Sequence, residues 1–178
     1  MLAMRGKAYE SRDTANVRFR KAVTMKDAKT LLREFLAAVT HGQDAAAQFA
    51  EDGALELPFL HSLGIPWRHR GRQAISELQA SLAELYLDFA FKPEDTHVLI
   101  DTPSQVFAEY MAHPTVKATG RTVHHLFTGR LVVENGQIKL LRESLNTVAV
   151  GQALLPGGVK GLPDPEKVIF SVSPHYRT

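Results

Sequence analysis

The sequence has no cysteine and no apolar run approaching the roughly 20 residues that a helix needs to cross a bilayer. The absence of cysteine excludes a disulfide framework and thiolate chemistry. Charged residues follow the first four positions at once, so the N-terminus lacks the apolar centre of a signal peptide. We therefore expect a cytoplasmic protein without a membrane partner, and 178 residues suit one domain with its own core.

Basic charge is concentrated near the N-terminus. Residues 1–24 hold six bases and two acids, which leaves 15 bases and 17 acids for the rest of the chain. The body therefore has no nucleic-acid footprint, and we expect no nucleic-acid partner. The arm resembles a transit peptide or an RNA contact in composition, but a solvated, disordered tail is the commoner explanation. Because Met25 directly precedes an amphipathic helix, we expect it to be the physiological start.

Hydrophobic periodicity predicts helices first and strands later. Helical spacing runs from Asp27 to about residue 41, a short helix follows Asp44, and a longer helix covers about residues 72–89. A strand at 54–59 and a loop at 60–71 lie between the second and third helices. After Pro93, β-rich segments cover 96–100, 104–112, 121–134 and 137–150. This order predicts an α+β domain over residues 25–155, with three N-terminal helices on a sheet and an irregular tail at 156–178.

The Asn135-Gly136 pair predicts a two-residue hairpin turn, because a type I′ turn requires positive φ at both central positions. A regular ladder from this turn pairs Thr128 with Glu143 and places Arg142 on the opposite face. The alternation alone does not decide which face is inside.

Three motifs resemble the SnoaL-like branch of the NTF2-like superfamily: "AEDGALELP", "GRQAI" at a helix start, and "GRLVVENGQIKLLRESLN". The ending "LLRESLNTVAVGQALL" is similar to phenazine biosynthesis A/B-type proteins, and the resemblance covers residues 27–155. It implies a curved antiparallel sheet wrapped around a cone-shaped pocket, three closing helices and a homodimer formed through the sheet.

The same superfamily includes ketosteroid isomerase, whose catalytic groups are an Asp base, a Tyr and a protonated Asp. Alignment on the shared motifs places Leu57, Phe35 and Thr128 at those positions, so the isomerase's own proton shuttle is not expected here. The alignment also turns Glu143 inward. The pocket wall that it implies consists of Phe35, Leu57, Trp67, Leu126, Thr128, Leu141 and Leu145.

Glu143 on this apolar wall should have a raised pKa from desolvation. We expect it to be the main catalytic acid/base, with His124 on the same face as an auxiliary and Arg130 as its electrostatic partner. The alternatives are a buried Glu143–Arg130 pair without catalysis, and a His124 bonded to Thr147 or a carbonyl group. Trp67 either stacks on a ligand or anchors its loop.

The predicted function is that of a small-molecule pocket protein performing cofactor-independent acid/base chemistry on a hydrophobic or aromatic carbonyl compound. Isomerisation, cyclisation, condensation and dehydration all fit. The alternative is a non-catalytic ligand-binding or dimerising module. We expect no metal site, because adjacent His124 and His125 on a strand point in opposite directions and no metal-ligand motif is present.

Overall fold

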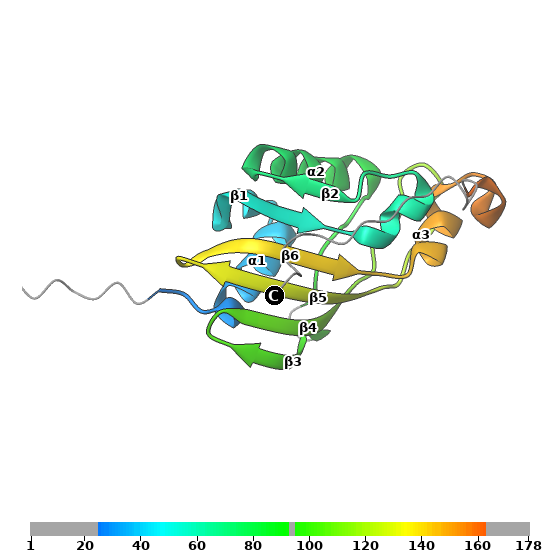
Figure 1. The fold of residues 1–178 in the computed structure, drawn as a ribbon. Coiled ribbons are helices and arrows are strands. Elements are labelled where there is room, and N and C mark those ends of the chain that lie inside the picture. Colours follow the sequence, from blue (N-terminus) through cyan, green and yellow to red (C-terminus); the bar gives the residue numbers. More distant parts are fainter. Residues whose placement is uncertain (1–24, 93–94, 163–178) are drawn as a thin grey trace, which may run out of the picture.

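The computed structural model describes residues 25–92 and 95–162, in which six strands form one curved sheet in the order β2-β1-β6-β5-β4-β3 (Figure 1). Neighbouring strands are antiparallel, except for the parallel pair β1 and β6. The strands are β1 (Phe49–Glu56), β2 (Arg68–Arg70), β3 (His97–Thr102), β4 (Gln105–Ala112), β5 (His125–Glu134) and β6 (Gln137–Ser144). The helices are α1 (Ala28–Thr40), α2 (Arg72–Leu85) and α3 (Thr147–Leu154), with 3₁₀ helices η1 (Ala45–Gln48), η2 (Pro58–Leu63) and η4 (Gly158–Gly161). The predicted α+β class is confirmed.

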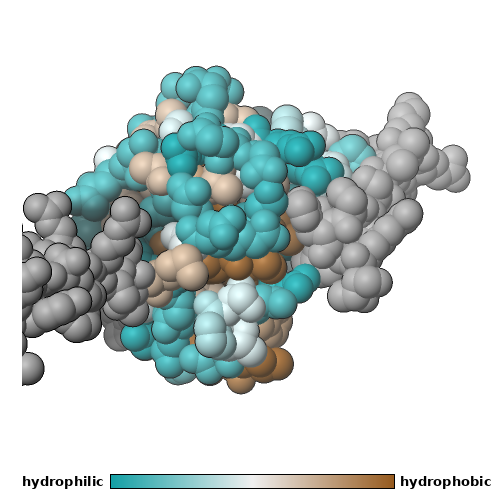
Figure 2. All heavy atoms as spheres, turned by 60° about the vertical axis from the view of Figure 1, so that its left-hand side comes forward, coloured by the Kyte–Doolittle hydropathy of each residue, from teal (hydrophilic) through white to brown (hydrophobic). Residues whose placement is uncertain are grey.

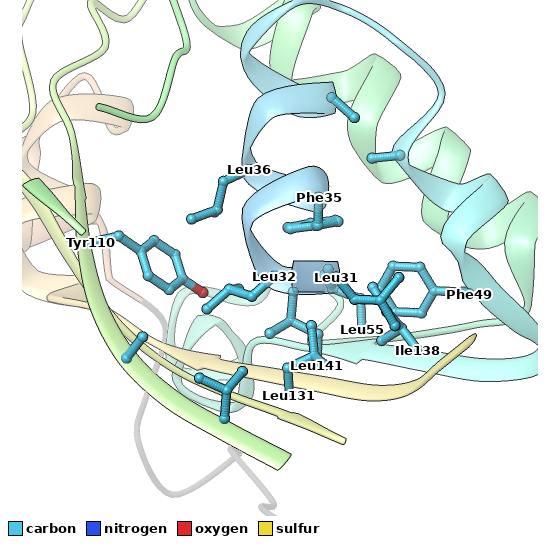
Figure 3. Packing of buried hydrophobic residues seen from close by; sticks show 14 of the residues in the cluster. Leu31, Leu32, Phe35, Leu36, Phe49, Leu55, Tyr110, Leu131, Ile138 and Leu141 are labelled. Carbon is cyan, nitrogen blue, oxygen red and sulfur yellow. The ribbon is translucent and has the colours of Figure 1, made fainter. Parts of the chain in front are cut away.

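Helix α1 covers the concave face of the sheet. It begins where the Asp27 side chain accepts a hydrogen bond of 2.8 Å from the Thr30 backbone nitrogen, which satisfies one unpaired amide of the first turn. Its buried stripe, which includes Leu32 and Phe35, points toward Leu131 and Leu141 of the sheet (Figure 3). This layer of apolar contacts forms the main core and leaves the cavity beside it.

The helices differ from the prediction in several places, and η2 occupies the end of the strand predicted at 54–59 and the start of the loop predicted at 60–71. The short second helix is the 3₁₀ helix η1, and α2 ends at Leu85 because Tyr86 is extended and bridges to Val116. The last predicted strand ends at Ser144. Asn146 then caps α3 by accepting a hydrogen bond of 3.1 Å from the Ala149 nitrogen, so residues 147–150 are helical despite their β-branched composition.

The predicted hairpin turn is confirmed, but its simple register is wrong. Asn135 and Gly136 both have positive φ, at 51° and 74°. The ladder shifts between Val132 and Val133 because β6 carries one extra residue there, so Thr128 pairs with Ser144 and Gly129 pairs with Glu143. The odd-numbered positions of β5 therefore face the helices, whereas a regular ladder places the even-numbered ones beside Glu143.

The surface seen in Figure 2 is mostly hydrophilic, with hydrophobic side chains gathered near its middle. Among the described residues, no helix combines the length and the apolar character that a membrane crossing requires. The predicted N-terminal arm, at residues 1–24, lies outside the described residues. The predicted irregular tail contains η4, and its part from residue 163 onward also lies outside them.

Candidate functional site

A cavity of about 130 Å³ lies between the concave face of the sheet and the helices. Its walls come from α1, β1, η2, α2, β5, β6 and α3, and nearly all of them are apolar. The aliphatic side chains of the wall include Leu55, Leu57, Leu60, Ile65, Ile75, Leu78, Leu82, Leu145, Val150 and Leu154, and the phenyl rings are Phe35, Phe89, Phe91 and Phe127. A dry cavity of similar volume holds a molecule about the size of benzene.

Glu143 lines this cavity, and 4% of its surface is exposed. The Tyr110 hydroxyl group, from β4, donates a hydrogen bond of 2.5 Å to Glu143 Oε1. Burial raises the pKa of Glu143 to about 7, although the Tyr110 hydrogen bond acts in the opposite direction. A carboxyl group with this pKa is available as both a proton donor and a proton acceptor near neutrality.

Gly129 makes room for the Tyr110 hydroxyl group. A Cβ atom at position 129 would stand 2.2 Å from Tyr110 Oη, which is closer than any non-bonded contact allows. Gly129 is also the cross-strand partner of Glu143. The absence of a side chain at this position therefore lets the tyrosine reach the carboxyl group.

His125 is another buried ionisable group of the cavity wall. Burial is the main cause that lowers the pKa of His125 to about 4, and the charge of His113 is the smaller cause. The imidazole ring of His125 is therefore neutral at pH 7. Its Nδ1 atom is buried and has no hydrogen-bond partner among the described residues. Neither His125 nor Tyr110 was predicted from the sequence as part of the site. Alternation along "VFAEYMA" places Tyr110 opposite Glu109, and the register shift determines the face of His125.

The predicted partners of Glu143 lie on the other side of the sheet. Arg130 is paired with Arg142 across the strands and donates hydrogen bonds of 3.1 and 2.7 Å to Gln105 Oε1. His124 is exposed, and its Nδ1 lies 2.9 Å from His113 Nδ1 rather than near Thr147. The expected placement of Arg130 and His124 beside Glu143 is therefore wrong, and so is the alternative of a Glu143–Arg130 pair.

The predicted pocket wall is divided in the same way. Phe35, Leu57 and Leu145 line the cavity, and Leu141 is fully buried in the core next to it. Leu126 and Thr128, both at even-numbered positions of β5, face outward, and Leu126 is 45% exposed. Trp67 is not in the cavity wall, and its carbonyl oxygen accepts a hydrogen bond of 2.7 Å from the Leu57 nitrogen.

A second buried acid lies on the outward face. Glu56 is fully buried and contacts Arg142 at 2.6 Å and Arg68 at 3.1 Å. These guanidinium groups supply the positive charge that a buried carboxylate requires. Glu143 has no such partner in its cavity wall, which contains no Lys or Arg. Across the described ranges, no group of three or more His, Asp or Glu residues is arranged to hold a metal ion.

The family model of the SnoaL-like domain matches residues 32–141 of the sequence. The chain therefore belongs to this family. No curated protein matches. Among solved structures, an isomerase candidate from Bacillus subtilis is 23% identical, with a TM-score of 0.63, over 74% of this chain and 93% of that one. An NTF2-like protein from Burkholderia pseudomallei is 15% identical, with a TM-score of 0.63, over 74% of this chain and 99% of that one.

A phenazine biosynthesis-related protein from Pseudomonas aeruginosa is 19% identical, with a TM-score of 0.59, over 78% of this chain and 87% of that one. At these identities the likeness concerns the fold. It confirms the expected NTF2-like architecture, and the family and the cavity together support a small-molecule pocket protein.

The two buried cavity groups should affect stability in opposite directions. In the folded protein the pKa of Glu143 is raised from 4.5 to about 7. Its stabilising contribution to the free energy of unfolding is therefore fully present below pH 4.5 and is lost as the pH rises to 7. In the folded protein the pKa of His125 is lowered from 6.5 to about 4. Its stabilising contribution to the free energy of unfolding is therefore present above pH 6.5 and is lost as the pH falls to 4. Between pH 4.5 and 6.5 we expect the two effects to offset each other.

Chemical denaturation of three proteins between pH 4.5 and 6.5 tests this balance. Glu143→Gln should gain about 3 kcal/mol of unfolding free energy relative to wild type as pH rises, and His125→Gln should lose a similar amount. Parallel pH profiles for the three proteins would contradict the burial of both groups without a partner of opposite charge.

Removing the Tyr110 hydroxyl group should raise the pKa of Glu143 further. In Tyr110→Phe the carboxylate loses its hydrogen-bond donor, and we expect a rise of about one pH unit. Gly129→Ala should shift the pKa in the same direction, because the new methyl group displaces the hydroxyl group. The pKa is measured by carbon-13 NMR of the Glu143 carboxyl group. Gly157→Ala, where the nearest atom is 3.9 Å from the new Cβ, is the control and should leave it unchanged.

Proposed function

We propose that this protein catalyses cofactor-independent proton transfer on a hydrophobic or aromatic carbonyl compound, with Glu143 as the acid/base group. The supporting observation is the Glu143 carboxyl group buried in an apolar cavity, with a pKa of about 7. General acid/base catalysis is most efficient when the catalytic pKa lies near the working pH. Isomerisation, cyclisation, condensation and dehydration of such a compound all use this chemistry.

In the carboxylate form, Glu143 removes a proton from the carbon next to the ligand's carbonyl group, and an enol or enolate forms. The resulting carboxylic acid then returns the proton to another atom, which isomerises the ligand, or protonates a leaving hydroxyl group, which dehydrates it. The Tyr110 hydroxyl group acts on Glu143 rather than on the ligand, since it donates to Oε1 from outside the cavity wall. Tyr110 is thus a positioning residue that stabilises the carboxylate form.

The proposal keeps Glu143 in its predicted role and assigns none to His124 or Arg130, whose side chains lie away from the cavity. It also differs from ketosteroid-type proton transfer. Leu57 and Phe35 contribute only apolar surface to the wall, and Thr128 faces outward.

Hydrogen–deuterium exchange of the acetophenone methyl group tests the proposed proton transfer. Acetophenone is a small aromatic carbonyl compound, a benzene ring with one acetyl group, and proton NMR in D₂O follows the loss of its methyl signal. Wild-type protein should accelerate exchange over buffer, with a rate that rises with pH and levels off above about 7, because the carboxylate removes the proton. Glu143→Gln should lower the rate by about 100-fold or more while acetophenone affinity is retained.

Glu109→Gln is the matched control, because Glu109 lies on β4 next to Tyr110 and therefore on the opposite face of the sheet. It should exchange acetophenone at the wild-type rate. Equal rates for Glu143→Gln and wild type would contradict the role of Glu143.

The second candidate is a binding protein without catalysis, which the almost wholly apolar wall favours. In this case wild-type protein would bind acetophenone, and its methyl protons would exchange at the rate of the buffer.

We also propose that two chains associate through the outward face of the sheet. Leu126 of β5 is 45% exposed on this face, and Ile100 of the edge strand β3 is 66% exposed. Exposed apolar side chains on a sheet are commonly covered by a second subunit. A cytoplasmic location remains a prediction from the sequence.

Light scattering after size-exclusion chromatography should give twice the chain mass for wild type. Leu126→Arg should give the mass of one chain, because it buries a charge in the proposed interface. Val148→Arg, at a 52% exposed position of α3 away from the sheet, should remain dimeric. A wild-type monomer, or a dimeric Leu126→Arg variant, would exclude this interface.

A further inference from the structure

Few polar side chains of the cavity wall are available to a ligand. Gln79 Oε1 accepts a hydrogen bond of 3.1 Å from the Ala45 nitrogen, and Gln79 Nε2 donates one of 2.5 Å to the Gln43 carbonyl oxygen. The Ser81 hydroxyl group donates to the Leu78 carbonyl oxygen at 2.6 Å. Gln79 is thus engaged by the η1 segment and Ser81 by its own helix α2. The remaining polar side chains of the wall are Glu143, His125 and Tyr86, and among these His125 carries a buried polar atom without a hydrogen-bond partner in the described residues.

His125 has an unmet hydrogen-bonding requirement. Its side chain is 2% exposed and lines the cavity, and Nδ1 has no partner among the described residues. Aromatic rings surround the imidazole: Phe127 at 5.3 Å and Tyr86 at 6.3 Å between ring centroids. Buried polar atoms are rarely left unpaired in native proteins, because each unmade hydrogen bond is costly. A polar atom of a bound ligand would remove this cost.

His125 and Glu143 lie at different positions along the same wall. Glu143 pairs with Gly129, which is four residues from His125 along β5. Four residues of strand separate the Cα atoms of Gly129 and His125 by about 13 Å. Phe127 lies between them on the same face and also lines the cavity. A single small functional group therefore cannot contact both residues, whereas two groups at opposite ends of one ring can.

We propose that His125 binds a second polar group of the ligand, so that the cavity takes a small, uncharged, mainly apolar molecule with a hydrogen-bonding group at each end. This inference rests on the proposed function for the carbonyl end, which is bound at Glu143. The wall contains no Lys or Arg to balance an anionic group, and its one acid, Glu143, is assigned to the carbonyl end, so the ligand is uncharged. A hydroxyl group suits the His125 end, since it can donate to or accept from Nδ1 in either tautomer.

Acetophenone and 4-hydroxyacetophenone form the test pair, because they differ only in a hydroxyl group opposite the carbonyl group. Isothermal titration calorimetry should show that wild-type protein binds the hydroxylated compound about tenfold or more tightly. His125→Phe keeps an aromatic ring in the wall and should bring the affinity ratio close to one. His124→Phe, at the neighbouring outward position, should keep the wild-type ratio. In Glu143→Gln the preference for the hydroxylated compound should also persist.

Nitrogen-15 NMR of the wild-type histidines provides a readout that does not depend on how a variant folds. The His125 Nδ1 resonance should shift when 4-hydroxyacetophenone binds and remain nearly unchanged with acetophenone. An unaffected resonance, an unchanged ratio in His125→Phe, or binding of neither compound to wild type would overturn the proposal. Exchange of the acetophenone methyl protons reports separately on Glu143, so a failure of the proposed reaction is distinguishable from a failure of His125 binding.

Discussion

The burial of the Glu143 carboxyl group is the constraint on which the rest of the cavity depends. An acid without a positive partner in an apolar wall retains its proton to near neutral pH, and in the described part of the chain the Tyr110 hydroxyl group is the hydrogen-bond donor that stabilises its charged form. The surroundings follow from this requirement. Gly129 has no side chain, which admits the tyrosine, and the aliphatic and aromatic wall excludes water that would otherwise solvate the carboxylate.

A single extra residue in β6 decides which side chains meet inside. Because side chains alternate along a strand, the shift between Val132 and Val133 brings the odd-numbered positions of β5 to the side of Glu143. His125 and Phe127 thereby enter the cavity wall, while His124 and Arg130 point away from it. The same irregularity thus decides which β5 side chains face the cavity and which face outward. A change in one set changes the other set as well.

Much of this arrangement could be predicted from the sequence. The helical stripe of α1, the Asn135-Gly136 turn and the inward position of Glu143 followed from periodicity, turn chemistry and family resemblance. The companions of Glu143 could not be predicted, because a bulge leaves no marked signal in the residues around Lys139 and reverses the parity of β5. Helix α3 was missed for a related reason: its Thr and Val residues favour a strand, and the Asn146 cap outweighs that preference.

The neighbours Arg142 and Glu143 belong to two different ways of accommodating an acid in the interior of a protein. On the outward side, Arg142 and Arg68 match the charge of Glu56 with guanidinium groups. On the inward side, a proton takes the place of the arginine, and its presence depends on the surrounding solution. The thickness of one sheet therefore separates an acid matched by fixed charges from an acid matched by an exchangeable proton, and the buried acid on the concave side responds to pH near neutrality.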